Sequence, residues 1–240
     1  MKNDSTKIIC EVALRAYRQS EDARELNDER SRLDWLFVHE KLMKVLRAEQ
    51  PATTTKFDIW KCVSPKSEMN TRPQMCGIWH EDGYEVASDQ HILVWRKAEY
   101  PEAYEHRIAY KDGSFAEEHL RYPKWRMVIP EKNNLTVKID IARFREAYKE
   151  WSSKMKAYRK GATGDNPGIG VVKAGESFFK MDYFKLAVDF MEAYGIDELK
   201  LNEAPNRASL ISDEAQGCGF LMMPMQKPDN AEFTPDVEFA

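Results

Sequence analysis

The sequence predicts an α+β fold with an additional helical segment at its N-terminal side. Three observations lead to this prediction. Apolar residues recur with a helical period in residues 32–48 and 140–160. Between these two segments the pattern becomes strand-like around the turn at Asp82-Gly83, and more strand-like stretches follow near the C-terminal end. With 240 residues, 42% of them hydrophobic, the chain can bury a real core.

The N-terminal part is rich in charged residues and reads as helical. Trp35, Val38, Leu42 and Val45 follow a helical spacing, so residues 32–48 should form an amphipathic helix that buries this stripe. The stretch "PATTT" breaks the pattern at 51–55. A short helical piece at 56–64 then ends at Ser64-Pro65, because the residue before proline avoids the helical region.

The middle of the chain predicts antiparallel strands. Residues 75–80 and 83–95 flank the Asp82-Gly83 turn and should form a hairpin. A second, smaller pattern surrounds a turn at Asp112-Gly113. Residues 121–130, bounded by Pro123 and Pro130, should be extended at or beyond a sheet edge.

Residues 140–160 give the clearest helix. Its apolar stripe consists of Phe144, Tyr148, Trp151, Met155 and Tyr158. A basic ribbon runs beside this stripe and contains Arg145, Lys149, Lys156, Arg159 and Lys160. A ribbon of this kind is either a solvated face or a surface that meets phosphates without reading bases.

The C-terminal part should hold one more helix among several strands. After a glycine-rich loop at 161–170 and a short strand at 169–174, a helix is expected at 182–194, with Asp182 as N-cap and Gly195 after its end. The remaining strand-like stretches are 198–203, 208–212 and 219–225. Beyond them, the acidic, proline-bearing tail should be mobile.

Composition narrows the functional classes. The formal net charge of −4 argues against binding to nucleic acid by bulk charge, although a local basic face can still bind it. The four cysteines lack the spacing of a disulfide framework, which indicates reduced thiols. No secretory or membrane-spanning stretch is visible. We therefore expect a cytoplasmic protein that is not inserted in a membrane.

Signals for enzyme chemistry or a cofactor are weak. Cys62, Cys76, His80 and His91 lack the short paired spacing of structural zinc sites. The glycine-rich loop contains neither a complete Walker sequence nor a complete dinucleotide-binding fingerprint. Ser88, Asp89 and His91 are close in sequence, yet neighbouring strand side chains point in differing directions, so a nucleophile and base are not expected here. We predict no catalytic residues, no metal and no cofactor.

Four short stretches carry a family resemblance. They are "TRPQMCGI" at 71–78, "VASDQHILV" at 86–94, "RYPKWRMVIP" at 121–130 and "FLMMPMQ" at 220–226. In this order they resemble segments of the bacterial sliding clamp, the beta subunit of DNA polymerase III. The resemblance covers about residues 56–226 and implies an abbreviated clamp-like fold, with helices on one face of antiparallel sheets.

The resemblance also implies a function. In that family these stretches line a hydrophobic cleft that receives short peptide motifs of DNA polymerase and other replication proteins. Carried onto this sequence, the cleft residues are Ser88, His91, Leu93, Pro123, Val128, Leu221, Met223, Pro224 and Met225. Methionine is flexible and polarisable, which suits a surface that accepts several apolar ligands. An isolated methionine-rich strand would otherwise be read as core.

The chain departs from the family in length and at several positions. It has room for about two of the three clamp domains, so we expect an N-terminal extension at 1–50, shortened clamp-like domains at 51–132 and 133–226, and a flexible tail at 227–240. Gln90, Ile92, Lys124 and Gln226 replace the residues typical of the family, which predicts a different peptide preference.

Two functions therefore remain open at this stage. The first is a processivity factor that encircles or contacts duplex DNA through the basic ribbon, as a homo-oligomer if a ring is to close. The second is an adaptor or inhibitor that binds partner peptides without a DNA ring.

Overall fold

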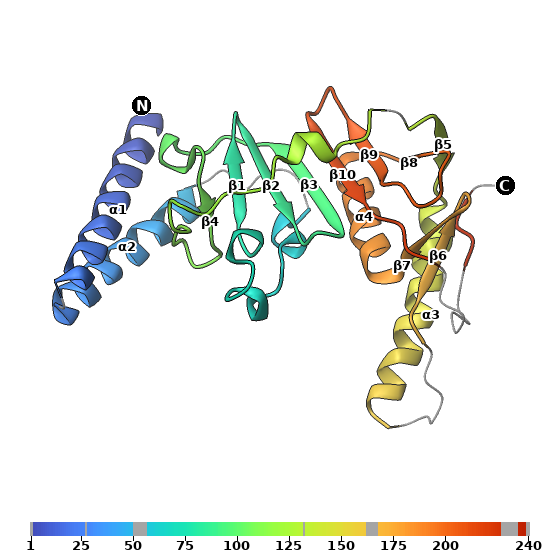
Figure 1. Cartoon of the computed structure of the whole chain (residues 1–240), viewed down its shortest axis with the longest axis horizontal. Coiled ribbons are helices and arrows are strands. Elements are labelled where there is room, and N and C mark those ends of the chain that lie inside the picture. Colours follow the sequence, from blue (N-terminus) through green and yellow to red (C-terminus); the bar gives the residue numbers. More distant parts are fainter. Residues whose placement is uncertain are drawn as a thin grey trace. The chain divides into compact units, whose positions relative to one another are not determined.

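A computed structural model describes residues 2–26, 28–49, 57–131, 133–161, 168–226 and 235–238 (Figure 1). The chain divides into two units that we describe separately. Unit 1 consists of Met1–Lys56, Val63–Ala87 and Lys97–Tyr122; unit 2 consists of Phe57–Cys62, Ser88–Arg96 and Pro123–Ala240. The N-terminal helices belong to unit 1, and two short central segments belong to unit 2.

Unit 1 begins with a helical hairpin. Helices α1 (Lys2–Glu25) and α2 (Glu29–Glu49) pack along each other across a short turn (Figure 1). Asp28 caps α2, since its Oδ1 accepts a hydrogen bond from the backbone N–H of Ser31 at 3.1 Å. The predicted helix at 32–48 lies within α2, but Trp35 and Val38 of its apolar stripe are exposed.

Three antiparallel strands form the sheet of unit 1. The strand β1 (Ile78–Glu81) lies between β2 (Tyr84–Ser88) and the short β4 (Ile108–Ala109). Asp82 and Gly83 both have positive φ, as a two-residue hairpin turn requires. The predicted hairpin around this turn is therefore confirmed.

The main sheet of unit 2 has five antiparallel strands in the order β3–β10–β9–β8–β5. Their bounds are β3 Ile92–Lys97, β10 Cys218–Met222, β9 Ser209–Asp213, β8 Glu198–Leu201 and β5 Leu135–Lys138. A separate hairpin pairs β6 (Val171–Ala174) with β7 (Ser177–Lys180). The α+β class predicted from the sequence is confirmed.

Two helices complete unit 2. Helix α4 (Met181–Tyr194) packs against β10 and the β6–β7 hairpin. Helix α3 (Ile141–Arg159) lies against α4 in its first half and extends well past it (Figure 1). Phe144 of α3 is fully buried, with its ring centroid 5.1 Å from that of Phe184 on α4.

Strand alternation gives the sheet of unit 2 two different faces. Phe220 of β10 points toward α4, where its ring centroid lies 5.6 Å from that of Phe190 and 6.3 Å from that of Phe57. Because neighbouring side chains of a strand point to opposite faces, Gly219 and Leu221 belong to the other face. One face of β10 thus builds the helix-covered core, and Leu221 on the other face is also buried.

Three local predictions are wrong. A turn at Ser88–His91 interrupts the single strand expected at 83–95, and Gln90 adopts a φ of 82° there. The segment 121–130 is not extended throughout, because Trp125–Val128 forms a 3-10 helix whose Trp125 side chain is buried. The N-cap of α4 is Lys180 rather than Asp182, although Gly195 ends the helix in the predicted left-handed conformation.

The described part of the tail is anchored to unit 2. The backbone N–H of Asp140 donates to the carbonyl of Val237 at 2.8 Å, and that of Lys173 donates to the carbonyl of Pro235 at 3.0 Å. The Val237 side chain is fully buried. Residues 235–238 therefore do not follow the prediction of a mobile tail, while 227–234 and 239–240 lie outside the described residues.

Candidate functional site

A tight turn sets the start of β3. The Ser88 hydroxyl is buried and donates to the carbonyl of Ile92 at 2.7 Å. Oδ1 of Asp89 accepts hydrogen bonds from the backbone N–H groups of His91 and Ile92, both at 3.0 Å. Ser88 was expected at the polar margin of a cleft; in the structure its hydroxyl stabilises this turn.

The pairing of β3 with β10 joins two of the four family-like stretches. Leu93 lies directly opposite Leu221, and Trp95 lies opposite Gly219. All four residues occupy the sheet face that points away from α4, since Val94 and Phe220 occupy the other. Gly219 is required here: an added Cβ would lie 2.1 Å from Cζ2 of Trp95.

The third family-like stretch, residues 121–130, contacts the same face of the sheet through Trp125. The Trp125 ring of the 3-10 helix lies 5.7 Å from the Trp95 ring, centroid to centroid, and the guanidinium of Arg126 lies 4.4 Å from the Trp125 ring centroid. With Trp125 anchored, the flanking side chains of Pro123, Met127 and Val128 are exposed. Buried tryptophan contacts thus hold an exposed apolar segment against β3.

The methionine stretch after β10 is fixed at both ends. The backbone N–H of Met223 donates to the carbonyl of His91, and that of Met225 donates to the carbonyl of Phe178 on β7, each at 2.8 Å. Pro224, which has no N–H to donate, lies between them. The Met223 side chain is 40% exposed, whereas Pro224 and Met225 are half-buried.

We call this region the β3–β10 face. It includes residues of β3, the 3-10 helix, the end of β10 and the stretch that follows it: Leu93, Pro123, Trp125, Met127, Val128, Leu221, Met223, Pro224 and Met225. Trp125 contacts Trp95 on β3, whereas Met223 bonds the backbone of His91, four positions earlier, and Met225 bonds β7. Leu93 and Leu221 are buried and form its floor. The exposed apolar contribution comes from the 3-10 helix and Met223.

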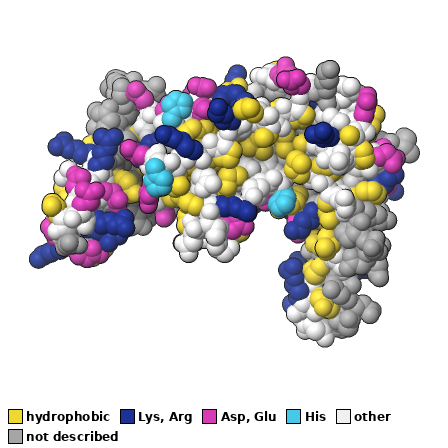
Figure 2. Space-filling view, viewed as in Figure 1, with side chains coloured by type: hydrophobic (Ala, Val, Ile, Leu, Met, Phe, Trp, Pro, Cys, Tyr) yellow, Lys and Arg dark blue, Asp and Glu magenta, His cyan; other side chains and the backbone are white. Residues whose placement is uncertain are grey.

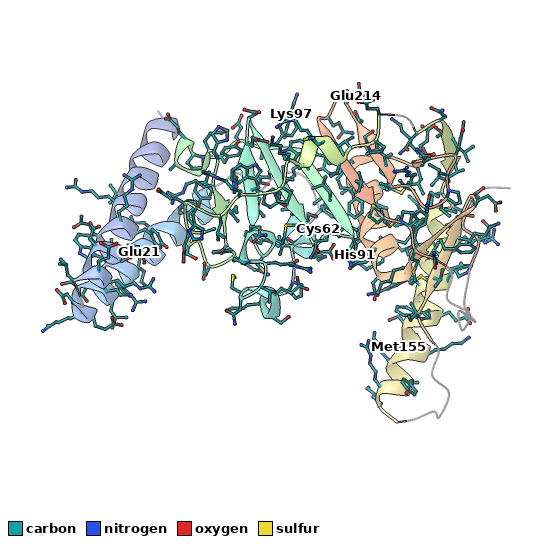
Figure 3. The ribbon with its side chains drawn as sticks, in the orientation of Figure 1. Glu21, Cys62, His91, Lys97, Met155 and Glu214 are labelled. Atoms are coloured by element: carbon teal, nitrogen blue, oxygen red, sulfur yellow. The ribbon has the colours of Figure 1, made fainter. Side chains whose placement is uncertain are left out.

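His91 lies beside the methionine stretch. Its side chain is exposed, and its ring centroid lies 5.6 Å from that of Tyr183 on α4. In Figure 3, His91 and Glu214 label opposite ends of the strands that carry this face; Glu214 lies in the turn between β9 and β10. Tyr183 and Met127 were not identified from the sequence, because neither occupies a matched position of the four stretches.

The residues of the basic ribbon on α3 have different surroundings in the structure. The guanidinium of Arg145 lies 2.7 Å from Oδ1 of Asp189 and also contacts Glu192, both on α4. Burial alone would raise the pKa of Asp189, but hydrogen bonds from Lys185 and Arg145 outweigh it and hold that pKa below its ordinary value. Arg145, one of the residues expected to contact DNA, pairs with these two carboxylates and so links α3 to α4.

Replacing Arg145 with glutamine should lower the free energy of unfolding by about 1 kcal/mol at neutral pH. The difference from wild type should begin to shrink as pH falls below about 4, the ordinary pKa of an aspartate in the unfolded chain. It should vanish at a lower pH, where Asp189 is protonated in the folded protein as well, because the ion pair depresses its pKa. Urea unfolding at a series of pH values measures this. Lys154→Gln is the control, since its exposed pair with Glu150 should contribute less than about 0.5 kcal/mol. A pH-independent difference would contradict the ion-pair account.

The rest of the ribbon is exposed. Its members are Lys149, Lys156, Arg159 and Lys160. None of the four forms an ion pair with any residue that the structure describes. Figure 2 shows Lys and Arg side chains beside a row of hydrophobic ones on the part of α3 that extends past α4, where Figure 3 labels Met155. Of the predicted stripe, Phe144 and Trp151 are buried, whereas Tyr158 is exposed.

The residues considered for catalysis or metal binding are held by packing and hydrogen bonds within the fold. Within the described ranges, no group of three or more His, Cys, Asp or Glu side chains is arranged to hold a metal ion. The His80 ring is buried between the edges of Tyr100 and Tyr104, and burial lowers its pKa, so it remains neutral near pH 7. Burial raises the pKa of the Cys62 thiol. The Ser88 hydroxyl bonds a backbone carbonyl rather than His91.

Bacterial sliding clamps are similar to this chain. The clamp of Caulobacter crescentus, solved with polyethylene glycol bound to a putative beta-motif tethering region, is 14% identical over 70% of this chain and 61% of its own, with a TM-score of 0.46. The DNA polymerase III beta chain of Streptococcus pneumoniae is 13% identical over 70% and 60% of the two chains, also with a TM-score of 0.46.

The beta clamp of H. pylori in complex with diflunisal gives a similar result, with 13% identity over 72% of this chain and 65% of the clamp, and a TM-score of 0.46. The chain spans about three fifths of the length of the clamps it matches. No protein-family model matches the sequence, and none of the curated proteins does.

Length and hydropathy together decide whether a helix can cross a lipid bilayer. Among the helices that the structure describes, none is long and apolar enough to do so.

Proposed function

We propose that this chain is a non-catalytic, sliding-clamp-like accessory protein of DNA replication, which holds short linear peptides of a polymerase or another replication protein on its β3–β10 face. The observation that carries the proposal is the meeting of three family-like stretches, far apart in the sequence, around β3 of one unit. Leu93 pairs with Leu221, Trp125 packs on Trp95, and Met223 bonds the backbone of His91.

The physical character of this face supports a docking role. Leu93 and Leu221 give an apolar floor, while Met127, Val128 and Met223 expose apolar side chains that gain by excluding water. Methionine side chains can repack around ligands of different shape. The two backbone hydrogen bonds on either side of Pro224 hold the recognition segment in place before a ligand arrives, which lowers the ordering cost of binding.

The mechanism that follows is tethering. A polymerase held by a peptide near DNA has a high effective concentration for its template, so its processivity rises without bond chemistry in the clamp-like protein. Lys149, Lys156, Arg159 and Lys160 are the groups that would meet the phosphates of duplex DNA. Arg145 is not part of this proposed DNA surface.

Replacing the methionines of this stretch with glutamate should abolish peptide docking. Met223→Glu and Met225→Glu together should weaken binding of a fluorescent peptide from a polymerase clamp-binding segment by more than about thirtyfold, measured by anisotropy. A charge placed on this face must be desolvated when an apolar peptide binds. The melting temperature should change little for Met223→Glu, because that side chain is substantially exposed.

Leu135→Glu is the matched control. Leu135 is an exposed apolar residue of the same unit on β5, outside the β3–β10 face, so this variant should bind the peptide like wild type. Equal peptide affinity in wild type and the double methionine variant would overturn the proposed docking site. A large loss of stability on Met223→Glu would instead mean that this stretch is core.

Removing the free basic charges of α3 should weaken DNA binding in a salt-dependent manner. Lys149→Ala and Lys156→Ala together should flatten the plot of log affinity against log salt concentration for duplex DNA, with a change in slope of about 0.9 for each phosphate that the variant no longer neutralises. Lys154→Ala serves as the control, since Lys154 pairs with Glu150. If the wild-type protein binds the peptide but not DNA at low salt, the chain acts as an adaptor or inhibitor without a DNA role.

A further inference from the structure

The β6–β7 hairpin of unit 2 is held along both of its outer edges by the part of the chain that follows β10. On the β7 edge, the backbone N–H of Met225 donates to the carbonyl of Phe178 at 2.8 Å. On the β6 edge, the backbone N–H of Lys173 donates to the carbonyl of Pro235 at 3.0 Å, and that of Val237 donates to the carbonyl of Lys173 at 3.4 Å. The hairpin therefore lies between two segments of the same stretch of chain.

Four residues form one continuous row across these segments and the hairpin. Lys173 and Phe178 are partners within the hairpin. Met225 forms a bridge to Phe178 on one edge. Asp236 forms a bridge to Lys173 on the other edge, where its Oδ2 also lies 3.7 Å from Nζ of Lys173. Because bridged residues lie side by side in a ladder, a displacement at the β6 edge reaches Met225 through one row of backbone contacts.

Residues 235–238, which we call the strap, also bind unit 2 outside the hairpin. The backbone N–H of Asp140, the N-cap of α3, donates to the carbonyl of Val237 at 2.8 Å, and the Val237 side chain is fully buried. The carboxylate of Glu238 accepts a hydrogen bond from the backbone N–H of Gly175, in the turn between β6 and β7. The strap thus ties the start of α3 to both the middle of β6 and the turn of the hairpin.

A hairpin of two strands depends on neighbours of this kind. The β6–β7 hairpin is not part of the five-stranded sheet, and an isolated pair of strands is at best marginally stable in water. Helix α4 packs against one face of it, where the ring centroids of Phe179 and Phe184 are 5.8 Å apart. The hydrogen bonds at its two edges add a restraint that this packing does not supply. Loss of the strap would therefore free the β6 edge and loosen the strand to which Met225 is bonded.

We propose that the strap positions Met225 for peptide docking, because it fixes the β6–β7 hairpin and the hairpin in turn fixes this end of the methionine stretch. The inference rests on the proposed function, since Met225 is a member of the β3–β10 face. Met223 lies outside this connection, because its backbone N–H bonds the carbonyl of His91 instead. A recognition segment that is already ordered loses less entropy on binding, so the strap raises peptide affinity without contacting the peptide.

Amide hydrogen exchange of the full chain tests this connection without any ligand. In Val237→Ala, the backbone N–H of Met225 should exchange about tenfold faster than in wild type, whereas that of Met223 should change less than about twofold. Ile211→Ala is the matched control, because Ile211 is similarly buried on β9, which does not pair with the hairpin. It should lower the melting temperature at least as much, since it removes a larger side chain, yet it should leave the ratio of the two exchange rates as in wild type.

Two substitutions of Glu238 test the contact with the hairpin turn. Glu238→Ala leaves the backbone N–H of Gly175 without this acceptor, so exchange at Met225 should become about threefold faster. Glu238→Gln keeps a side-chain oxygen that can accept the same hydrogen bond, and it should restore most of the wild-type rate. A strap that only stabilises the fold would alter the melting temperature without changing the exchange of Met225 relative to Met223.

Peptide affinity gives the functional measurement. At a temperature at which all variants are folded, Val237→Ala should bind the polymerase-derived peptide about fivefold more weakly than wild type, and Ile211→Ala should bind it equally well. Unchanged affinity in Val237→Ala would overturn the positioning role, as would equal acceleration of exchange at Met223 and Met225. A wild-type chain that does not bind the peptide would overturn the proposed function, and the exchange rates would still show whether the strap holds Met225.

Discussion

Gly219→Ala should destabilise unit 2 by about 3 kcal/mol, a large effect for the addition of one methyl group. The new Cβ would lie 2.1 Å from Cζ2 and 2.6 Å from Cε2 of Trp95. The indole cannot simply move aside, because Trp95 is buried and packs against Trp125. Urea unfolding followed by tryptophan fluorescence measures the loss. Peptide binding should fall with it, since Trp125 anchors the exposed segment at 123–128.

A second substitution tests whether the loss of stability on Gly219→Ala has a steric cause. Trp95→Phe shortens the ring that meets the added methyl group, so G219A/W95F should be more stable than the sum of the two single effects predicts. Gly195→Ala is the control, because nothing lies within 4 Å of its added Cβ and only its φ of 69° opposes the change. It should cost about 1 kcal/mol. Strict additivity of Gly219→Ala and Trp95→Phe would contradict the proposed clash.

Val237→Asp should destabilise unit 2 by about 4 kcal/mol, even though the residue lies in a segment whose sequence predicts mobility. The Val237 side chain is fully buried, and its carbonyl accepts a hydrogen bond from Asp140 at the start of α3. A carboxylate at this position would be removed from water without a partner. The smaller change Val237→Ala should cost about 2 kcal/mol.

Asp236→Asn is the matched control in the same segment. The carboxylate of Asp236 lies 3.7 Å from Nζ of Lys173, and both side chains are partly exposed, so the loss should stay below about 0.5 kcal/mol. Thermal unfolding of the three variants side by side gives the comparison. If Val237→Asp unfolds like wild type, residues 235–238 do not contribute to the stability of unit 2.

The periodic patterns of the sequence predicted most elements, because long stripes and turn dipeptides depend on local chemistry. The stripe from Phe144 to Tyr158 gave α3, and Asp82-Gly83 gave the β1–β2 hairpin. The interruption at Ser88–His91 was missed, because Gln90 takes a positive φ that its residue type does not favour. The hydrogen bonds of Ser88 and Asp89 hold that turn, and a pattern of hydrophobicity does not reveal them.

Only some residues of the candidate site were predicted, because the prediction rested on matching residue types in the sequence and not on packing. Leu93, Leu221 and Met223 were named; the structure pairs Leu93 with Leu221 and bonds the backbone of Met223 to His91. Trp95 and Gly219 were not named, since their fit depends on register across β3 and β10. The ion pairs of Arg145 were not predicted, because the carboxylates that pair with it lie more than forty positions later in the sequence, on α4.

The register between β3 and β10 has a consequence for synthesis. These two strands are separated by more than a hundred residues, so the floor made by Leu93 and Leu221 requires a contact between distant parts of the chain. While a ribosome is still short of Cys218, β3 lacks this neighbour, and the Trp95 indole lacks the glycine that accommodates it. A nascent chain at that stage has no assembled surface to offer a ligand, and its unpaired strand edge is open to aggregation.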